Sequence, residues 1–295
     1  MIQRTPFANA LTYGVMIFGF LLLIGPFIVI VSGASQTFQQ VNAVPFSLLP
    51  QDRLIENMSA AWERANLGTA MLNSLVMASL VTIGKVALSA LTAFAIVFFR
   101  TPLKGFFFWM VFITLMLPLE VRVVPTYAVA ADPFQPVRLL ISAVTGFEVS
   151  VDWNLLNSYA GLTLPLIATA TGTFLYRQFY LTLPDELAEA ARMDGSGAIR
   201  FFIDMLLPLS RTNMLALTTI MFVYGWNQYL WPLLMVTDPQ YKTTMMSLIA
   251  LLPSENGTPD WNVTLAGSLI IMLPPLIVVA VLQRWFVRGL VATEK

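Results

Sequence analysis

Long apolar segments, separated by polar ones, account for most of the chain. Six of them are long enough to cross a bilayer as helices, because about 20 residues rising about 1.5 Å each span its hydrocarbon core. They lie within residues 11–31, 71–99, 106–129, 159–179, 209–236 and 263–282. None shows the ten-residue alternation of membrane strands, and only helices satisfy their own backbone hydrogen bonds in lipid. The pattern predicts an all-α, polytopic membrane protein with six transmembrane helices.

The polar stretches between these segments predict loops of unequal length. The first apolar segment is longer than the apolar part of a cleaved signal peptide, so we expect it to remain as a membrane anchor. In the polar stretch that follows, residues 55–66 are predicted to form a helix. Residues 131–157 form a long loop, which could contact a soluble partner or serve only as a connection.

The composition supports the membrane assignment and narrows the chemistry. The chain has 295 residues, of which 57% are apolar and 11% charged, and its mean hydropathy is +0.75. It contains no cysteine and no histidine, which removes thiolate sites, the usual zinc ligands and the commonest general base. Its net charge of zero indicates no attraction to nucleic acid. We therefore expect no catalytic residue, no metal and no cofactor, and membrane lipid as the surroundings.

The distribution of lysine and arginine predicts the orientation. Ten of these residues lie on the side of the N-terminus, five lie on the other side, and Lys85 lies inside the second apolar segment. Because cytoplasmic loops are enriched in positive charge, the N-terminal side is predicted to be cytoplasmic. The resulting boundaries are residues 1–10 for the cytoplasmic N-terminus, 11–290 for the six-helix transmembrane domain, about 32–68, 130–157 and 237–262 for its outer loops, 183–208 for a cytoplasmic loop, and 291–295 for the cytoplasmic tail.

The cytoplasmic loop, Leu183 to Pro208, is unusually charged for this chain. Its charged residues are Asp185, Glu186, Glu189, Arg192, Asp194, Arg200 and Asp204. Pro184 suits the first turn of a helix, the two acids after it suit the helix N-terminus, and Gly195 is a natural stop. Ser196 could then cap a second helix. The sequence predicts a helix, a tight turn and another helix.

This loop has two possible uses on the pattern alone. Its acids could transfer protons, but Glu186 and Glu189 share a helix face with Arg192, which favours pairing in solvent. The alanines on the other face would let a second backbone approach closely, which suits docking into a groove. Arg200 and Asp204, four residues apart, could pair with a partner or with each other, and the internal pair is favoured.

A longer motif runs through the same loop. Its members are Glu189, Ala190 and Ala191, then Gly195, then Met205, Leu207 and Pro208. The spacing resembles the cytoplasmic EAA loop of permease subunits in binding-protein-dependent ABC importers. The resemblance implies the type I ABC importer permease fold, in which this loop forms coupling helices seated in a cleft of a separate ATPase. The residues it assigns to ATPase coupling are Glu186, Glu189, Ala190, Ala191, Asp194, Gly195, Arg200 and Pro208.

The resemblance covers nearly the whole chain and is greatest to the second permease of sn-glycerol-3-phosphate importers. It is carried by residues 108–126, 157–166, 174–195, 224–234 and 284–290. It implies a bacterial inner-membrane heterodimer with a second permease, an ATPase dimer, and a periplasmic or lipid-anchored substrate-binding protein. The implied substrate is sn-glycerol-3-phosphate, with another sugar, polyol or glycerophosphodiester as the alternative. The chain lacks the GxxxxGK[ST] phosphate loop, so ATP hydrolysis is assigned to the partner.

Two groups of residues are candidates for contact with a substrate. Lys85 lies inside a span, where a cation normally faces a cavity or a partner; it could bind an anionic phosphate, neutralise a carboxylate of the companion permease, or extend to the interface. Glu120 and Arg122 lie at the outer end of the third segment, where they could form an outer gate, although an ordinary interfacial pair is favoured.

The fifth segment adds Trp226, Asn227 and Gln228, which either line the pore or belong to an aromatic belt near the outer surface. The competing class for the whole chain is an ion-coupled secondary transporter. That class would show an internal repeat and acids deep within the spans, and the sequence shows neither clearly.

Overall fold

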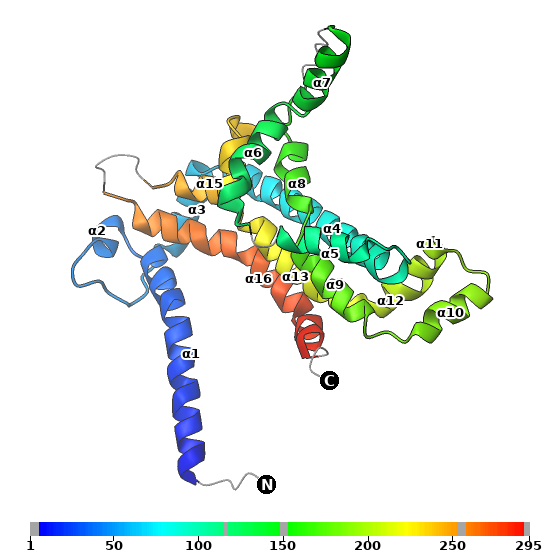
Figure 1. Ribbon diagram of the computed structural model, residues 1–295. Coiled ribbons are helices and arrows are strands. Elements are labelled where there is room, and N and C mark those ends of the chain that lie inside the picture. The colour runs from blue at the N-terminus through cyan, green and yellow to red at the C-terminus, as the bar shows by residue number, and fades with distance from the viewer. Residues whose placement is uncertain (1–5, 115–116, 148–152, 253–257, 292–295) are drawn as a thin grey trace. The chain divides into compact units, whose positions relative to one another are not determined.

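The structure is a computed structural model that describes residues 6–114, 117–147, 153–252 and 258–291 (Figure 1). Over these ranges the regular elements are all helices, as the sequence predicted. The chain divides into two compact units. Unit 1 consists of Met1–Gly68 and Met246–Leu273, and unit 2 consists of Thr69–Met245 and Pro274–Lys295.

Three helices in the described ranges are long and apolar enough to cross a membrane. They are α1 (Pro6–Ser35), α4 (Leu67–Phe98) and α16 (Trp261–Val291), which match the predicted first, second and sixth segments. A fourth span results if Ala198–Leu209 and α13 (Arg211–Trp226), which meet at an angle of 76°, are counted as one. The total of six spans stays a prediction.

The predicted third and fourth segments are each built from two shorter helices. The third contains α5 (Lys104–Ile113) and α6 (Leu119–Ala131), and the fourth contains α8 (Tyr159–Ile167) and α9 (Ala170–Tyr180). Hydropathy alone could not show these breaks, because the residues at each break are as apolar as the helices beside them.

Proline is the physical cause of the irregularity in the fourth segment. Pro165 lies inside α8 and has no N–H to donate to the carbonyl of Gly161, four residues earlier. The indole nitrogen of Trp231 donates to that carbonyl instead, at 3.1 Å. Beyond it, Ala168 and Thr169 have extended backbones, and α9 begins only at Ala170. The freed backbone group is therefore satisfied by a neighbouring helix, as it must be in an apolar environment.

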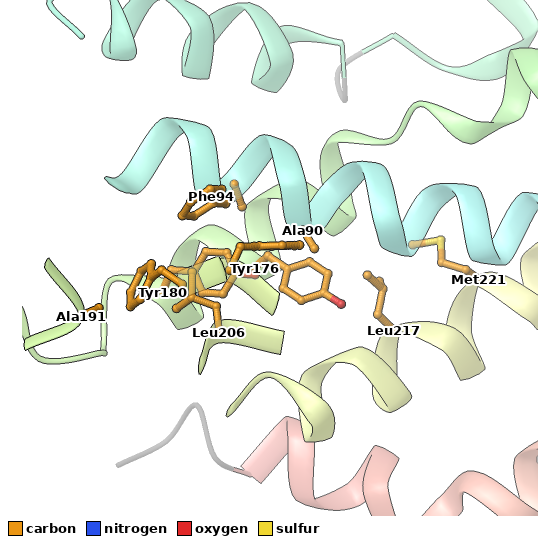
Figure 2. Close-up of a cluster of buried hydrophobic side chains, with 11 residues drawn as sticks. Ala90, Phe94, Tyr176, Tyr180, Ala191, Leu206, Leu217 and Met221 are labelled. Atoms are coloured by element: carbon orange, nitrogen blue, oxygen red, sulfur yellow. The ribbon is translucent and has the colours of Figure 1, made fainter. Parts of the chain in front are cut away.

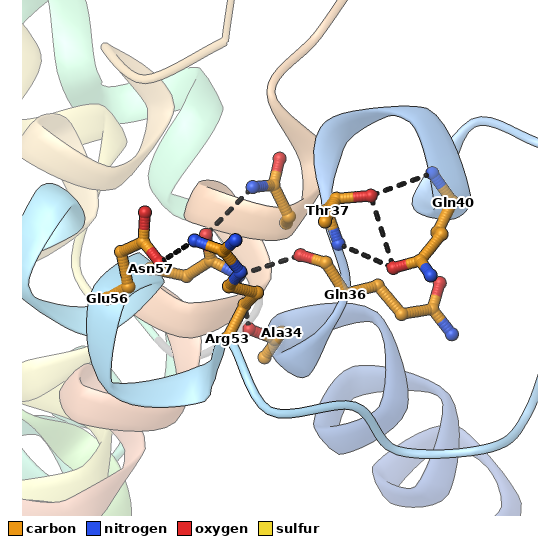
Figure 3. Close-up of polar contacts among 8 residues, drawn as sticks. Ala34, Gln36, Thr37, Gln40, Arg53, Glu56 and Asn57 are labelled. Carbon is orange, nitrogen blue, oxygen red and sulfur yellow. Dashed lines mark hydrogen bonds and ion pairs between the residues drawn. The ribbon is translucent and has the colours of Figure 1, made fainter.

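Unit 1 is held together by buried amide side chains (Figure 3). Asn57 lies on α3 (Leu54–Arg64), which confirms the helix predicted for residues 55–66. Its Nδ2 donates to the carbonyls of Ala34 and Gln36, each at 2.8 Å. Its Oδ1 accepts from Nδ2 of Asn262, at the start of α16, at 2.9 Å. These bonds fasten the polar stretch after α1 to the first turn of α16.

The remaining helices are short. Unit 1 has α2 (Phe38–Val41), which begins with a capping box between Thr37 and Gln40. In unit 2, α7 (Gln135–Thr145) lies within the stretch predicted to be a long loop, and none of its residues is buried. The others are α10 (Asp185–Met193), α11 (Ala198–Phe201), the π-helix η1 (Phe202–Leu206), α12 (Leu207–Leu209), α14 (Leu230–Met235), the 3₁₀ turn η2 (Pro239–Tyr241) and α15 (Thr244–Ile249).

The core of unit 2 lies where α4, α9 and the segment from α10 to α13 meet (Figure 2). Phe94 of α4 packs against Phe202 of η1, with ring centroids 5.1 Å apart. Tyr176 and Tyr180 of α9 pack against each other at 5.8 Å and are almost fully buried. Ala191 of α10 is buried in the same cluster. This aromatic cluster ties residues 183–208 to α4, the longest helix of unit 2.

Candidate functional site

The segment from Leu183 to Pro208 folds into a helix, a turn and a helix, as predicted, and forms one end of unit 2 (Figure 1). Its first helix, α10, follows Pro184, whose backbone is extended. The first turn of α10 contains two acids and its last turn contains Arg192, which complements the helix dipole at both ends.

Gly195 ends α10 for a conformational reason. Its φ is +71°, in the left-handed region that residues with a Cβ rarely adopt. The N–H of Gly195 donates to the carbonyl of Arg192, and the N–H of Ser196 donates to the carbonyl of Ala191 at 2.9 Å, which is the Schellman pattern. The prediction that Ser196 caps the next helix is wrong. Helix α11 begins after Gly197, whose extended backbone occupies the cap position without a side-chain cap.

The second part of the segment runs directly into α13. After α11 the backbone widens into η1, and π-helical turns of this kind are frequent at functional sites. The hydroxyl of Ser210 donates to the carbonyl of Leu206 at 2.6 Å, at the point where the chain bends by 76° into α13. The segment is therefore directly continuous with α13, and the buried Ser210 lies at the bend between them.

The coupling segment, residues 183–208, has a buried face and an exposed face. The buried residues are Ala191, Phe201, Phe202 and Leu206. The predicted coupling residues Glu186, Glu189, Ala190, Asp194, Gly195, Arg200 and Pro208 are exposed, while Ala191 is buried. Among them lie three large exposed apolar side chains, Met193 at 84%, Ile199 at 74% and Ile203 at 52%. Charged and apolar groups on one exposed face are what a docking surface requires.

Only one of the two ion pairs considered for this segment is present. Arg200 Nε lies 3.2 Å from Asp204 Oδ2, as favoured. Within the described residues, neither Glu186 nor Glu189 pairs with Arg192, although all three are exposed at helical spacing. The exposed carboxylates of α10 thus have no partner on their own helix.

A second candidate site is a cavity of about 590 Å³ in unit 2, formed by α4, α5, α6, α13 and the start of α9. Its described lining residues are Lys85, Leu88, Thr92, Met110, Val111, Thr114, Leu117, Arg122, Ala168, Thr169, Ala170, Thr171, Thr173, Met221 and Tyr224. Lys85 and Arg122 therefore share one cavity, although 36 positions in the sequence separate them. The described lining contains no carboxylate.

The two cations differ in their surroundings. Lys85 is 5% exposed, and its Nζ lies 4.5 Å from the centre of the Tyr224 ring, a cation–π contact. Arg122 is half-buried. Glu120 is the second residue of α6, but its side chain is not described, so a gate or an ion pair between Glu120 and Arg122 stays a prediction.

The aromatic and amide candidates of the fifth segment lie apart from this cavity. Trp226 is 1% exposed and stacks on Phe222 at 6.0 Å. Asn227 is exposed at the C-terminal cap of α13, and Gln228 donates to the carbonyl of Tyr224 at 3.2 Å. None of the three is among the described residues that line the cavity.

Comparisons with known proteins show which family the chain belongs to. A family described as the inner membrane component of binding-protein-dependent transport systems matches residues 85–291. The chain belongs to this family. The match begins at Lys85 and includes the coupling segment and the cavity. The permease is accordingly a transport subunit of the inner membrane.

Relatives and a solved structure agree with this membership. The permease is 45% identical, over 301 aligned residues and the full length of both chains, to the sn-glycerol-3-phosphate transport system permease protein UgpE of Escherichia coli strain K12. The same identity and coverage hold for UgpE of Shigella flexneri serotype 5b. A bacterial ABC transporter involved in the import of the acidic polysaccharide alginate superposes with a TM-score of 0.72, over 97% of this chain and 99% of that one, at 18% identity. This superposition confirms the ABC importer permease fold.

Lys85 and Arg122 are separate candidates in the sequence, which does not identify the other groups that line the cavity between them. The signal available in the sequence was a cluster of threonines, at positions 163, 169, 171 and 173, beside Pro165. Threonines and a proline inside an otherwise apolar segment favour a broken helix whose backbone must find other partners.

Proposed function

We propose that this permease is one of two different membrane subunits of an ATP-driven importer, and that its substrate is sn-glycerol-3-phosphate. The observation that carries the proposal is the coupling segment, whose exposed charged face is continuous with α13. Identity to UgpE over the full chain supports the substrate. In this proposal the chain crosses the membrane six times, both termini are cytoplasmic, and residues 32–68, 130–157 and 237–262 face outward.

The energy comes from a partner ATPase dimer. We place its contact on Glu186, Glu189, Ala190, Asp194, Gly195, Arg200 and Pro208. Ala191 would support this contact from the buried side of the segment, where it packs in the aromatic cluster. ATP binding would pull the two copies of this segment, one on each permease, toward each other. Because the segment is packed into the aromatic cluster and continues into α13, this motion would bias the pore between inward-open and outward-open states. A periplasmic or lipid-anchored binding protein would deliver the substrate to the outward-open state.

Trp226, Asn227 and Gln228 remain proposed contributors to the pore outside the cavity. Asn227 is the exposed member, so it is the side chain that a passing solute or the companion permease would meet. Asn227→Ala should lower uptake while assembly with the ATPase stays intact. Unchanged transport kinetics in this variant contradict a pore role, and the group would then belong to an aromatic belt at the interface.

The experiment for the whole proposal uses the importer reconstituted in liposomes with its companion permease, ATPase and binding protein. ATP hydrolysis is measured with sn-glycerol-3-phosphate, glycerol, a glycerophosphodiester and a neutral sugar. Stimulation by the phosphate ester alone is expected. Equal stimulation by glycerol or a neutral sugar overturns the phosphate assignment, and ATP-independent uptake driven by an ion gradient overturns the importer assignment itself.

A further inference from the structure

The cavity that contains Lys85 and Arg122 also receives the start of a helix. Helix α9 has 11 residues and begins at Ala170, and its first residues, Ala170 and Thr171, line the cavity. The first N–H groups of a helix have no partner inside it, and the side chain of the cap residue, Thr169, makes no capping bond here. Such an end carries a partial positive charge and binds anions.

The two cations reinforce this site independently of the helix. Lys85 is almost fully buried, and among the described residues it has a ring partner but no carboxylate. Leaving a buried ammonium without a counter-charge is costly, so such a group faces an anion when the protein functions. Arg122 adds a second cation on the same cavity, and its planar guanidinium suits two oxygens of one anion.

Two glycines allow these parts to come close together. A Cβ on Gly84 would lie 2.7 Å from side-chain atoms of Ile167, and a Cβ on Gly172 would lie 2.3 Å from the hydroxyl of Ser89. Gly84 and Ser89 lie on either side of Lys85 along α4, and Ile167 and Gly172 lie on either side of the break between α8 and α9. The glycines therefore hold the open end of α9 against the part of α4 that carries Lys85.

We propose that this cavity is the phosphoryl subsite of the permease, and this inference rests on the proposed function. The phosphoryl oxygens would be shared by Lys85, Arg122 and the first N–H groups of α9. Two cations match a phosphate monoester, which carries about −1.5 to −2 charges at neutral pH. The hydroxyls of Thr92 and Thr114, which also line the cavity, would form hydrogen bonds with the glycerol moiety. A volume of about 590 Å³ holds a molecule of this size with water.

The observations favour a small phosphorylated solute over a carboxylate of the companion permease. A single carboxylate would neutralise one cation only and would leave the helix end unused. A neutral sugar would leave both cations unpaired. The companion's carboxylate is nonetheless an occupant that the experiment has to distinguish.

The test uses the complete importer in lipid nanodiscs, without its binding protein, and measures acylation of Lys85 by an amine-reactive reagent, read by mass spectrometry. Inorganic phosphate and sn-glycerol-3-phosphate should each slow the acylation of Lys85, whereas glycerol should not. Lys104, which is exposed at the start of α5 and does not line the cavity, serves as the internal control. Protection of Lys104 to the same extent would show a general effect of ionic strength and overturn the proposal.

Transport by variants provides the second readout. Lys85→Gln and Arg122→Gln should each raise the KM for uptake about tenfold or more, because each removes a charge-assisted contact. Arg122→Lys, which keeps the charge, should recover part of this loss, and Lys104→Gln should behave like the unmodified importer. Basal ATP hydrolysis should be unchanged in Lys104→Gln, which lies outside the proposed subsite. Loss of assembly with the companion permease in Lys85→Gln would assign the lysine to a companion carboxylate and overturn the proposal. An unchanged KM in an assembled Lys85→Gln importer would overturn it as well.

The two proposals fail in different ways. If the unmodified importer transports sn-glycerol-3-phosphate but no phosphate compound protects Lys85, the subsite is wrong and the function stands. If phosphate protects Lys85 but sn-glycerol-3-phosphate is not transported, the subsite stands and the substrate is another phosphorylated solute.

Discussion

The coupling segment and the cationic cavity both involve helices α4, α9 and α13, but they differ in packing and in where their charged groups lie. At the coupling end these helices close on one another through aromatic side chains, and charged groups stay on the outside. At the cavity the same helices, together with α5 and α6, enclose a space of about 590 Å³ that is lined by Lys85 and Arg122. Exposed charges cost little to keep, whereas buried ones are retained only where something pairs with them.

This difference in packing suits the two regions to different functions. A densely packed cluster transmits displacement, because tightly packed interiors deform little. A cavity lined by the start of a broken helix leaves room for a solute instead. The four predictions that follow test whether coupling depends on the cluster and its exposed face alone, and they run from the largest expected effect to the smallest.

Reversing one charge on the exposed face should have the largest effect. Glu189→Lys should reduce ATP-dependent uptake by roughly tenfold or more, because a like charge at a docking surface disfavours the partner strongly. Substrate protection of Lys85 should be unchanged. Uptake and co-purification of the ATPase are measured together. Glu63→Lys, another exposed acid on a helix, is the matched control in unit 1 and should transport normally. Normal uptake by Glu189→Lys would remove this carboxylate from the ATPase contact.

Creating a cavity in the aromatic cluster by truncating a buried side chain should have the next largest effect. Phe202 is buried against Phe94, and Phe202→Ala should lower stability by roughly 2–4 kcal/mol, because the packing contacts are lost and lipid cannot refill the space. The readout is thermal unfolding of the complex in nanodiscs. Phe147→Ala removes an exposed ring and should leave the unfolding temperature nearly unchanged. Equal shifts for the two variants would mean that the cluster does not stabilise the coupling end.

A smaller effect is expected at the turn of the coupling segment. Gly195→Ala places a Cβ in the left-handed region and should cost about 1 kcal/mol, with a few-fold loss of uptake. Gly195→Asn should lose less, since Asn tolerates this conformation better. Gly197→Ala is the control, because that glycine has a φ of −72° and open space around its Cβ. If Gly195→Ala and Gly197→Ala behave alike, the left-handed turn is not required.

The smallest effect on stability is expected for the exposed ion pair. Arg200→Ala should change the free energy of unfolding by no more than about 0.5 kcal/mol, because an exposed pair four residues apart on a helix contributes little. Uptake should fall by more than this loss explains, since Arg200 belongs to the proposed ATPase contact. Asp204→Ala removes the same ion pair but keeps Arg200, so it distinguishes the contribution of the pair from a contact between Arg200 and the ATPase. Matching transport in both variants would indicate that the pair, and not the arginine, is what matters.

Much of the coupling segment could be predicted because it is contiguous. Pro184 and Gly195 set the limits of α10 through local backbone preferences, and the spacing of the motif identifies the family before any tertiary contact is known. Two local expectations were wrong. Among the described residues neither Glu186 nor Glu189 pairs with Arg192, and the cap of the second helix is Gly197 instead of Ser196, because either of these adjacent residues could precede that helix. The tertiary structure decided which of them did so.

The cavity could not be predicted in the same way, because its residues come from five separate helices. Hydropathy located the apolar segments around it but did not show that α5 and α6, or α8 and α9, are separate helices, since a broken helix and a continuous one have the same composition. The sequence by itself determined the helical class, the family, and the turn and charge pattern of the coupling segment, all of which depend on neighbours along the chain. Only the tertiary structure brought Lys85, Arg122 and the open end of α9 to one cavity, because that juxtaposition depends on glycine contacts between distant helices.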